Sequence, residues 1–182
     1  MRGLIMRAST TTVPAVLATA LLFLLAALPR AGLAGGSEFS LFPTSGGAWN
    51  FEETYVYTSL YTTHFDPEPE HNNHQKMLGV ELLMQNNWSF GLASFDNSFD
   101  QRSQYLYAGY RWTVPGHPAW SFKLSGGLLH GYEDEYQDKI PYNNLGTAPA
   151  IVPALGYRHG GFIFELNLAG LAAATVTAGY AF

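Results

Sequence analysis

The sequence contains no cysteine, which excludes disulfide bonds, thiolate metal sites and a cysteine nucleophile. Charge is also scarce: 13% of the 182 residues are charged, with 9 lysines and arginines against 14 aspartates and glutamates. This balance excludes nucleic acid as a partner, because phosphate binding needs a basic surface. A mean hydropathy of −0.01 is too low for a helical membrane protein. Few charges combined with 15% aromatic residues indicate a chain that is apolar on alternate residues.

The N-terminal segment has the pattern of a cleaved export signal. Arg2 and Arg7 precede an apolar run over 13–28, and small residues around Ala34 provide a cleavage site. The run is shorter than the roughly 20 residues that a membrane-spanning helix needs. We therefore predict export and cleavage, with 1–34 as a signal peptide.

Beyond this segment, large apolar residues alternate with small or polar ones. The alternation is clearest over 120–125, 162–168 and 175–182. A period of two gives a strand one apolar face and one different face. In a soluble sandwich the second face would be charged, whereas here it consists mainly of serine, glycine, threonine and alanine. Such small residues fit the interior of a narrow membrane barrel.

Eight strands of this kind are predicted, over 53–64, 76–84, 87–97, 103–113, 119–131, 147–158, 161–169 and 173–182. Compact turns alternate with longer loops between them, and an aromatic residue, Phe182, closes the last strand. The predicted fold is all-β: an eight-stranded antiparallel outer-membrane β-barrel over 53–182, after a cleaved signal peptide and an irregular segment over 35–52. Eight strands close without an exposed edge and leave no aqueous channel, which argues against a general porin.

Polar residues gather where predicted strands lead into the longer loops. His64 ends the first strand, and Asp96, Asn97 and Ser98 end the third. Strands of the same direction would bring His64 and Ser98 together at the outer rim. A histidine beside a hydroxyl can take its proton and activate an alcohol for acyl transfer, and the Asn97 amide can stabilise an oxyanion. The spacing alone leaves open that these are solvated loop residues.

Four segments carry a family resemblance: the tyrosine-rich strand ending in His64, and the stretches 94–99, 108–112 and 149–157. In this order they resemble the lipid A palmitoyltransferase family (PagP), in its divergent pseudomonad-type branch. That family is an eight-stranded outer-membrane barrel which moves a palmitoyl chain from a phospholipid to lipid A. The resemblance implies a phospholipid donor, a lipid A acceptor, no cofactor, and essential residues at His64 and Ser98 on the cell-surface side.

Two departures from the family pattern bear on the chemistry. The family has an Asp-Ser pair after the third strand, where this chain has Asn97 and Ser98, with Asp96 one residue earlier. Because neighbouring strand residues face opposite ways, Asp96 replaces that acid only if the rim is irregular. The family's N-terminal amphipathic helix becomes an irregular anchor here, since Pro43 and Gly46 break helices.

The barrel interior is expected to hold the acyl chain, which gains about 0.8 kcal/mol for each buried CH₂ group. Strand parity and the resemblance give the candidate lipid-binding residues Gly109, Arg111, Ser121, Ser125, Gly127, Pro149 and Pro153. Arg111, if it points inward, would shorten or polarise the pocket. In the family, gaps in strand pairing let lipid enter the barrel from the side. The resemblance implies that Pro149 and Pro153, which cannot donate a backbone hydrogen bond, form such a gap here. Alternatively, these prolines only mark the start of a strand.

Other patterns are weaker. His71 and His74 have a metal-like spacing without a third ligand, so no metal site is predicted. The acidic stretch over 134–138 is either solvated or holds a divalent cation that bridges lipopolysaccharide phosphates, which Lys139 and Arg102 could also contact directly. The main alternative function is a non-enzymatic, envelope-stabilising or adhesive barrel. A lipid A deacylase is less favoured because its neighbouring His-Ser pair is missing from the C-terminal half. The protein is expected to be a monomer.

Overall fold

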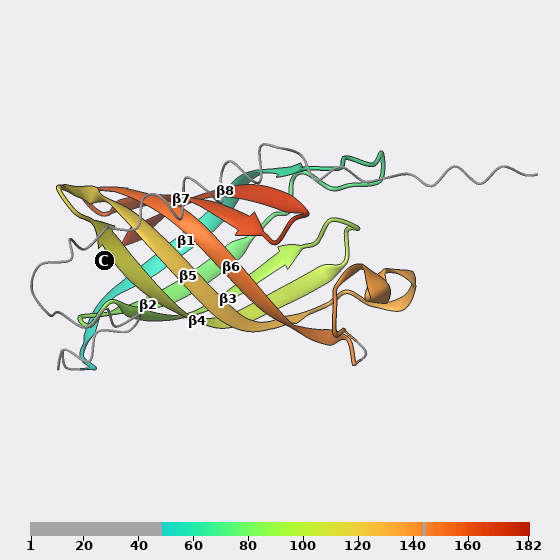
Figure 1. The fold of residues 1–182 in the computed structure, drawn as a ribbon, viewed down its shortest axis with the longest axis horizontal. Helices are drawn as coiled ribbons and strands as arrows, with labels where there is room; N and C mark the ends of the chain where they lie inside the picture. The colour runs from blue at the N-terminus through green and yellow to red at the C-terminus, as the bar shows by residue number, and fades with distance from the viewer. Residues whose placement is uncertain (1–48, 144) are drawn as a thin grey trace, which may run out of the picture. The chain divides into compact units, whose positions relative to one another are not determined.

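Eight antiparallel strands close into a barrel in the computed structural model, which describes residues 49–143 and 145–182 (Figure 1). The strands are β1 (Phe51–His64), β2 (Leu78–Met84), β3 (Trp88–Asp96), β4 (Arg102–Val114), β5 (His117–His130), β6 (Thr147–His159), β7 (Phe162–Ala169) and β8 (Ala173–Ala181). β8 pairs with β1 to close the sheet. No helix in the described ranges is long and apolar enough to cross a membrane.

The predicted fold is confirmed, and all predicted strand ends lie within two residues of the observed ones. The short turns lie at one end of the barrel, near the C-terminus, and the longer loops at the other, where a 3-10 helix, η1 (Asp134–Lys139), lies between β5 and β6 (Figure 1). The predicted signal peptide over 1–34 and the predicted irregular anchor up to residue 48 lie outside the described residues.

Large apolar side chains cover the outside of the barrel. Leu92, Leu106 and Phe164, for example, are 50%, 61% and 43% exposed. The buried positions hold mainly tyrosines, alanines and polar or charged side chains instead. A continuous exposed apolar surface is typical of a lipid-facing wall, and alternation between this wall and a polar lumen is the pattern of outer-membrane barrels. The strands therefore cross the bilayer of an outer membrane.

Aromatic residues form a belt at the short-turn end. The ring pairs in this belt are Trp88 with Tyr110, Trp112 with Phe122, Trp120 with Tyr157, and Phe162 with Tyr180. Aromatic girdles mark the boundary between lipid tails and water in such barrels, and short turns belong to the periplasmic side. The longer loops lie at the opposite, outer end of the barrel.

A non-strand segment over 71–77 completes the wall where β2 is too short. β2 has seven residues and leaves the outer half of β1 without a strand partner on that side. The segment fills this place: the Thr62 N–H donates to the Asn73 carbonyl at 3.0 Å, and the Asp96 N–H donates to the Gln75 carbonyl at 2.7 Å. It thus bridges β1 and β3 and carries its side chains to the barrel mouth.

A layer of four buried charges crosses the middle of the barrel. Lys123 lies 2.8 Å from both Glu81 and Glu165, and Arg111 lies 3.5 Å and 3.1 Å from the same two carboxylates. The Tyr107 hydroxyl also donates to Glu81, at 2.7 Å. Two positive and two negative groups make the layer neutral. On its outer side lies a cavity of about 790 Å³, and on its periplasmic side a pocket of about 230 Å³.

Candidate active site

His64 and Ser98 are in direct contact at the outer rim. His64 is the last residue of β1, and Ser98 lies in the turn that follows β3. Their side chains point to the same place because the two strands run in the same direction. The distance between His64 Nε2 and Ser98 Oγ is 2.7 Å, a short hydrogen bond. The structure therefore brings together the two residues on which the sequence and the resemblance agree.

Asn73 fixes the tautomer of the histidine. Its Oδ1 lies 3.0 Å from His64 Nδ1. An amide oxygen only accepts hydrogen bonds, so the proton of the neutral imidazole is on Nδ1. His64 Nε2 is then the acceptor for the Ser98 hydroxyl. Serine, histidine and an orienting third group in this order form the arrangement that activates a nucleophilic hydroxyl.

Sequence reasoning missed Asn73 because the residues before 76 were treated as an ordinary loop. The structure shows that alternation continues through this segment. His71, Gln75 and Met77 line the cavity, whereas His74 and Lys76 are exposed. This weak period of two, with asparagine at an inward position, is the signal that could have identified the residue.

Asn97 is used to shape the turn that carries Ser98. Its side-chain nitrogen donates to Ser103 Oγ and to the Gly131 carbonyl, both at 3.1 Å. Its Oδ1 accepts the Phe99 N–H at 2.9 Å and the Gln101 N–H at 3.1 Å. The donors and acceptors of this buried amide are therefore all occupied. The geometry thus gives Asn97 a positioning role in place of the predicted contact with an oxyanion.

Asp96 does not reach the histidine. Its carboxylate lies 3.3 Å from Arg102, its partner across the end of the β3–β4 ladder. His64 Nδ1 is already bonded to Asn73. Among the described residues no carboxylate pairs with either nitrogen of His64. The contact that orients His64 therefore comes from Asn73 rather than from Asp96.

Three loops build an aromatic roof over the pair. The His71 ring stacks on His64 with centroids 4.2 Å apart, and the edge of Phe99 meets His71 at 5.5 Å. Tyr136, from η1, stacks on Phe99 at 4.1 Å, and the Lys139 ammonium lies 5.4 Å from the same ring. This roof shields the histidine from bulk water.

The two loop histidines face different surroundings. His71 belongs to the roof, whereas His74 packs against Tyr61 on the outer side of the barrel. Within 49–143 and 145–182, no group of three or more histidine, aspartate or glutamate side chains is arranged to hold a metal ion.

Tyr132 lies on another side of Ser98. Burial raises the pKa of its hydroxyl above the ordinary value, and hydrogen bonding with the Ser98 side chain and backbone acts in the opposite direction. Because the net shift is upward, the phenol is protonated at neutral pH. Tyr132 therefore adds a neutral polar contact to Ser98 and no charge.

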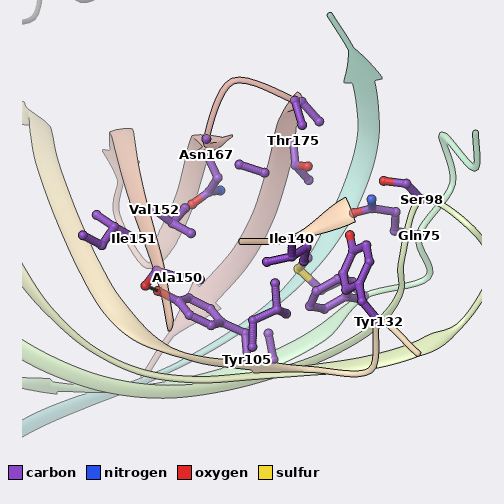
Figure 2. Close-up of a pocket in the computed structure, with 18 of the residues that line it drawn as sticks. Gln75, Ser98, Tyr105, Tyr132, Ile140, Ala150, Ile151, Val152, Asn167 and Thr175 are labelled. Atoms are coloured by element: carbon purple, nitrogen blue, oxygen red, sulfur yellow. Dashed lines mark hydrogen bonds between the residues drawn. The ribbon is translucent and has the colours of Figure 1, made fainter. Parts of the chain in front are cut away.

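The outer cavity leads from this pair into the barrel (Figure 2). Its lining as a whole is mainly apolar and includes Met77, Phe95, Leu129, Ile140 and Val152. Deeper residues are Tyr57, Tyr105 and Tyr107, and the Lys123–Glu165 pair forms the floor. A volume of about 790 Å³ is in the range of ligand pockets. A largely apolar cavity of this size has room for an alkyl chain.

The predicted lipid-binding residues separate into three groups. Ser125 and Pro149 line the outer cavity, whereas Arg111 and Ser121 line the periplasmic pocket, on the other side of the charged layer. Arg111 does point inward, but it lies beneath the floor. The remaining three, Gly109, Gly127 and Pro153, belong to neither lining.

The barrel wall has a gap beside the cavity. β6 pairs with β7 only from Ala154 to His159, so its outer half, over 147–153, has no ladder to β7. Pro149 and Pro153 lie in this half and have no N–H to donate. Ile151 is 68% exposed on the outer wall and also lines the cavity. The cavity therefore reaches the outer surface between β6 and β7.

No protein-family model and no curated protein sequence matches the chain. Solved structures with similar backbones include a de novo designed transmembrane β-barrel, with 12% identity and a TM-score of 0.48 over 71% of this chain and 95% of the other. The Yersinia pestis outer membrane protein Ail in a phospholipid bilayer nanodisc has 14% identity and a TM-score of 0.45, over 71% and 99%. Ail in complex with the heparin analogue sucrose octasulfate has 15% identity and a TM-score of 0.40, over 71% and 96%. Likeness at this level carries no information about activity.

Proposed function

We propose that this chain is an outer-membrane acyltransferase that moves a palmitoyl chain from a glycerophospholipid to lipid A. The observation that carries the proposal is the hydrogen-bonded series Ser98–His64–Asn73 at the mouth of a largely apolar cavity. A nucleophile beside a base needs an electrophile, and the cavity below it accepts an alkyl chain. An acyl ester whose tail enters the barrel places its carbonyl carbon at Ser98.

The chemistry takes two steps. His64 Nε2 accepts the proton of Ser98 Oγ as that oxygen attacks the ester carbonyl carbon of the phospholipid. The bond from carbonyl carbon to glycerol oxygen breaks, that oxygen takes the proton from His64, and the palmitoyl group remains on Ser98. A lipid A hydroxyl then gives its proton to His64 while attacking the acyl-serine, and that proton returns to Ser98 Oγ.

The gap between β6 and β7 supports delivery of lipids from the outer leaflet. It opens at the cell-surface end, at the level of the cavity and beside exposed Ile151. A lipid tail that moves sideways through this gap stays among apolar groups, and each CH₂ group that leaves water gains about 0.8 kcal/mol. In this proposal, Pro149 is one of the residues that border the opening.

Mass spectrometry of lipid A tests the proposal directly. The chain is expressed with its own leader in a Gram-negative host, and lipid A is compared with that from an empty-vector control. A gain of one palmitoyl group supports transfer. Loss of an acyl chain would show a deacylase, and an unchanged spectrum alongside folded barrel in the outer membrane would favour the non-enzymatic alternative.

Asn73→Ala is expected to lower turnover by about 100-fold. The imidazole loses the acceptor that fixes its tautomer and aims Nε2 at Ser98, and misplacement of about 1 Å costs that much. Asn73→Asp retains an acceptor oxygen and should keep most of the activity. The measurement is the initial rate of lysophospholipid release, and equal rates for wild type and Asn73→Ala would contradict the role of Asn73.

Ala93→Leu is expected to shift the selected acyl chain toward shorter lengths. Ala93 is buried on the inner face of β3 and lines the cavity, so three added carbons take the place of alkyl groups. Each CH₂ group of the acyl chain that can no longer be buried weakens binding by about 0.8 kcal/mol, which corresponds to about fourfold in selectivity. Competition among laurate, myristate and palmitate donors measures the shift. Ser94→Leu, on the outward face of the same strand, should leave the preference unchanged.

A further inference from the structure

Gln75 places an amide beside the proposed nucleophile. Its backbone carbonyl is held by the Asp96 N–H at 2.7 Å, and the neighbouring Asn72 N–H donates to the Ser98 carbonyl at 2.9 Å. The chain around Gln75 therefore runs alongside the turn that carries Ser98. Figure 2 shows the Gln75 side chain extending from this segment toward the space next to Ser98.

The Gln75 side chain faces the outer cavity. The residue is 7% exposed and lines the cavity together with His64 and Ser98. Across the described ranges, no hydrogen bond joins its side chain to another residue. An amide that faces a cavity without a protein partner is free to hydrogen-bond to a molecule bound there.

Backbone donors around Ser98 are already occupied. The N–H groups of Phe99 and Gln101 donate to the Asn97 side chain, and the Asp100 N–H donates to the Asn97 carbonyl. The Tyr132 hydroxyl also lies beside Ser98. Acyl transfer requires donors for the oxyanion that forms on the carbonyl oxygen. With the N–H groups of Phe99, Asp100 and Gln101 occupied, a cavity-facing side chain is a suitable donor.

We infer that the Gln75 side-chain amide is the oxyanion donor of this active site. The inference rests on the proposed acyl transfer and adds a catalytic residue to it. When Ser98 Oγ attacks the ester, the carbonyl π electrons move onto the carbonyl oxygen, and the Gln75 N–H donates to that oxygen. When the tetrahedral intermediate collapses, the same electrons re-form the carbonyl bond, so Gln75 neither gains nor loses a proton.

Kinetics of purified full-length protein in detergent micelles test the inference. The donor is dipalmitoyl phosphatidylethanolamine, the acceptor is lipid A, and lysophospholipid release is followed. Gln75→Ala is expected to lower kcat by about 10²- to 10³-fold with little change in KM, as for loss of one oxyanion donor. A role confined to packing would instead change KM or the yield of folded barrel.

Gln75→Glu keeps the shape and separates the two roles. An ionised carboxylate has no hydrogen to donate and repels an oxyanion, whereas a protonated carboxyl donates again. The rate of this variant relative to wild type should therefore rise as the pH falls from about 8 toward the range where a glutamate protonates. Taking the ratio at each pH removes any effect of pH that the two proteins share. Gln85→Glu, at an exposed periplasmic turn, is the matched control and should follow wild type throughout.

Labelling of Ser98 by an alkyl fluorophosphonate distinguishes failure of the inference about Gln75 from failure of the proposed acyl transfer. Its phosphoryl oxygen occupies the place of the oxyanion, so Gln75→Ala should slow labelling as it slows turnover. An active wild type with an unaffected Gln75→Ala variant and a flat ratio for Gln75→Glu would overturn the inference alone. A wild type that neither releases lysophospholipid nor labels at Ser98 would overturn the proposed function and the inference together.

Discussion

Ser98→Ala and His64→Ala are each expected to lower the rate of acyl transfer on the order of 10⁴- to 10⁶-fold. Ser98→Ala removes the oxygen that attacks the ester, and His64→Ala removes the group that takes its proton at 2.7 Å. Because the two residues act as one unit, the double variant should be no slower than the slower single variant. The measurement is palmitoyl transfer to lipid A, quantified by mass spectrometry at equal amounts of folded barrel.

Matched controls are available on the same molecule. Ser94→Ala alters a serine on the outward side of β3, and His159→Ala alters an exposed histidine at the periplasmic end of β6. Both should transfer palmitate as wild type does. Transfer that survives in either Ser98→Ala or His64→Ala would contradict the assignment of the active site, even if the barrel proved to be an acyltransferase.

Lys123→Met is expected to lower the free energy of unfolding by about 3–5 kcal/mol, the cost of leaving a buried charge unpaired. Lys123 is 4% exposed and lies 2.8 Å from both carboxylates of the charged layer. Without it, Arg111 alone faces Glu81 and Glu165, and the layer carries a net negative charge. Denaturant unfolding of the barrel in lipid vesicles gives the free energy.

The double variant Lys123→Met/Glu165→Gln isolates the electrostatic cause. It restores neutrality by leaving one carboxylate for Arg111, so most of the lost stability should return. Lys76→Met removes an exposed loop lysine and should change stability by less than about 0.5 kcal/mol. If the double variant were no more stable than Lys123→Met, loss of packing rather than unpaired charge would explain the effect.

The strands could be predicted from the sequence because lipid outside and small or polar groups inside impose a period of two. The same periodicity located the strand ends, so the meeting of His64 with Ser98 followed from strand direction. Asn73, the residue that orients His64, could not be found in this way. Whether Asn97 or Asn73 reaches the histidine depends on the path of the segment over 71–77 and on side-chain hydrogen bonds within loops, which no hydropathy pattern encodes.

The charged layer was beyond sequence reasoning for a related reason. In the sequence, Lys123 and Glu165 occupy inward positions of alternating strands. These strands, β5 and β7, are not neighbours in the barrel. The pairing of these two residues with Glu81 and Arg111 requires the stagger between strands, which the alternation does not define. The aromatic roof likewise depends on contacts among three loops that lie far apart in the sequence.

The charged layer also closes the cavity at its inner end, so a lipid tail can enter and leave the barrel only at the outer end, through the mouth or through the gap between β6 and β7. The proposed acyl-serine leaves its palmitoyl chain in this cavity. In acyl transfer by such a barrel, the palmitoyl chain stays in place while the head groups exchange above it. The lysophospholipid departs before lipid A attacks, and the kinetics should be of the ping-pong type, with parallel double-reciprocal lines.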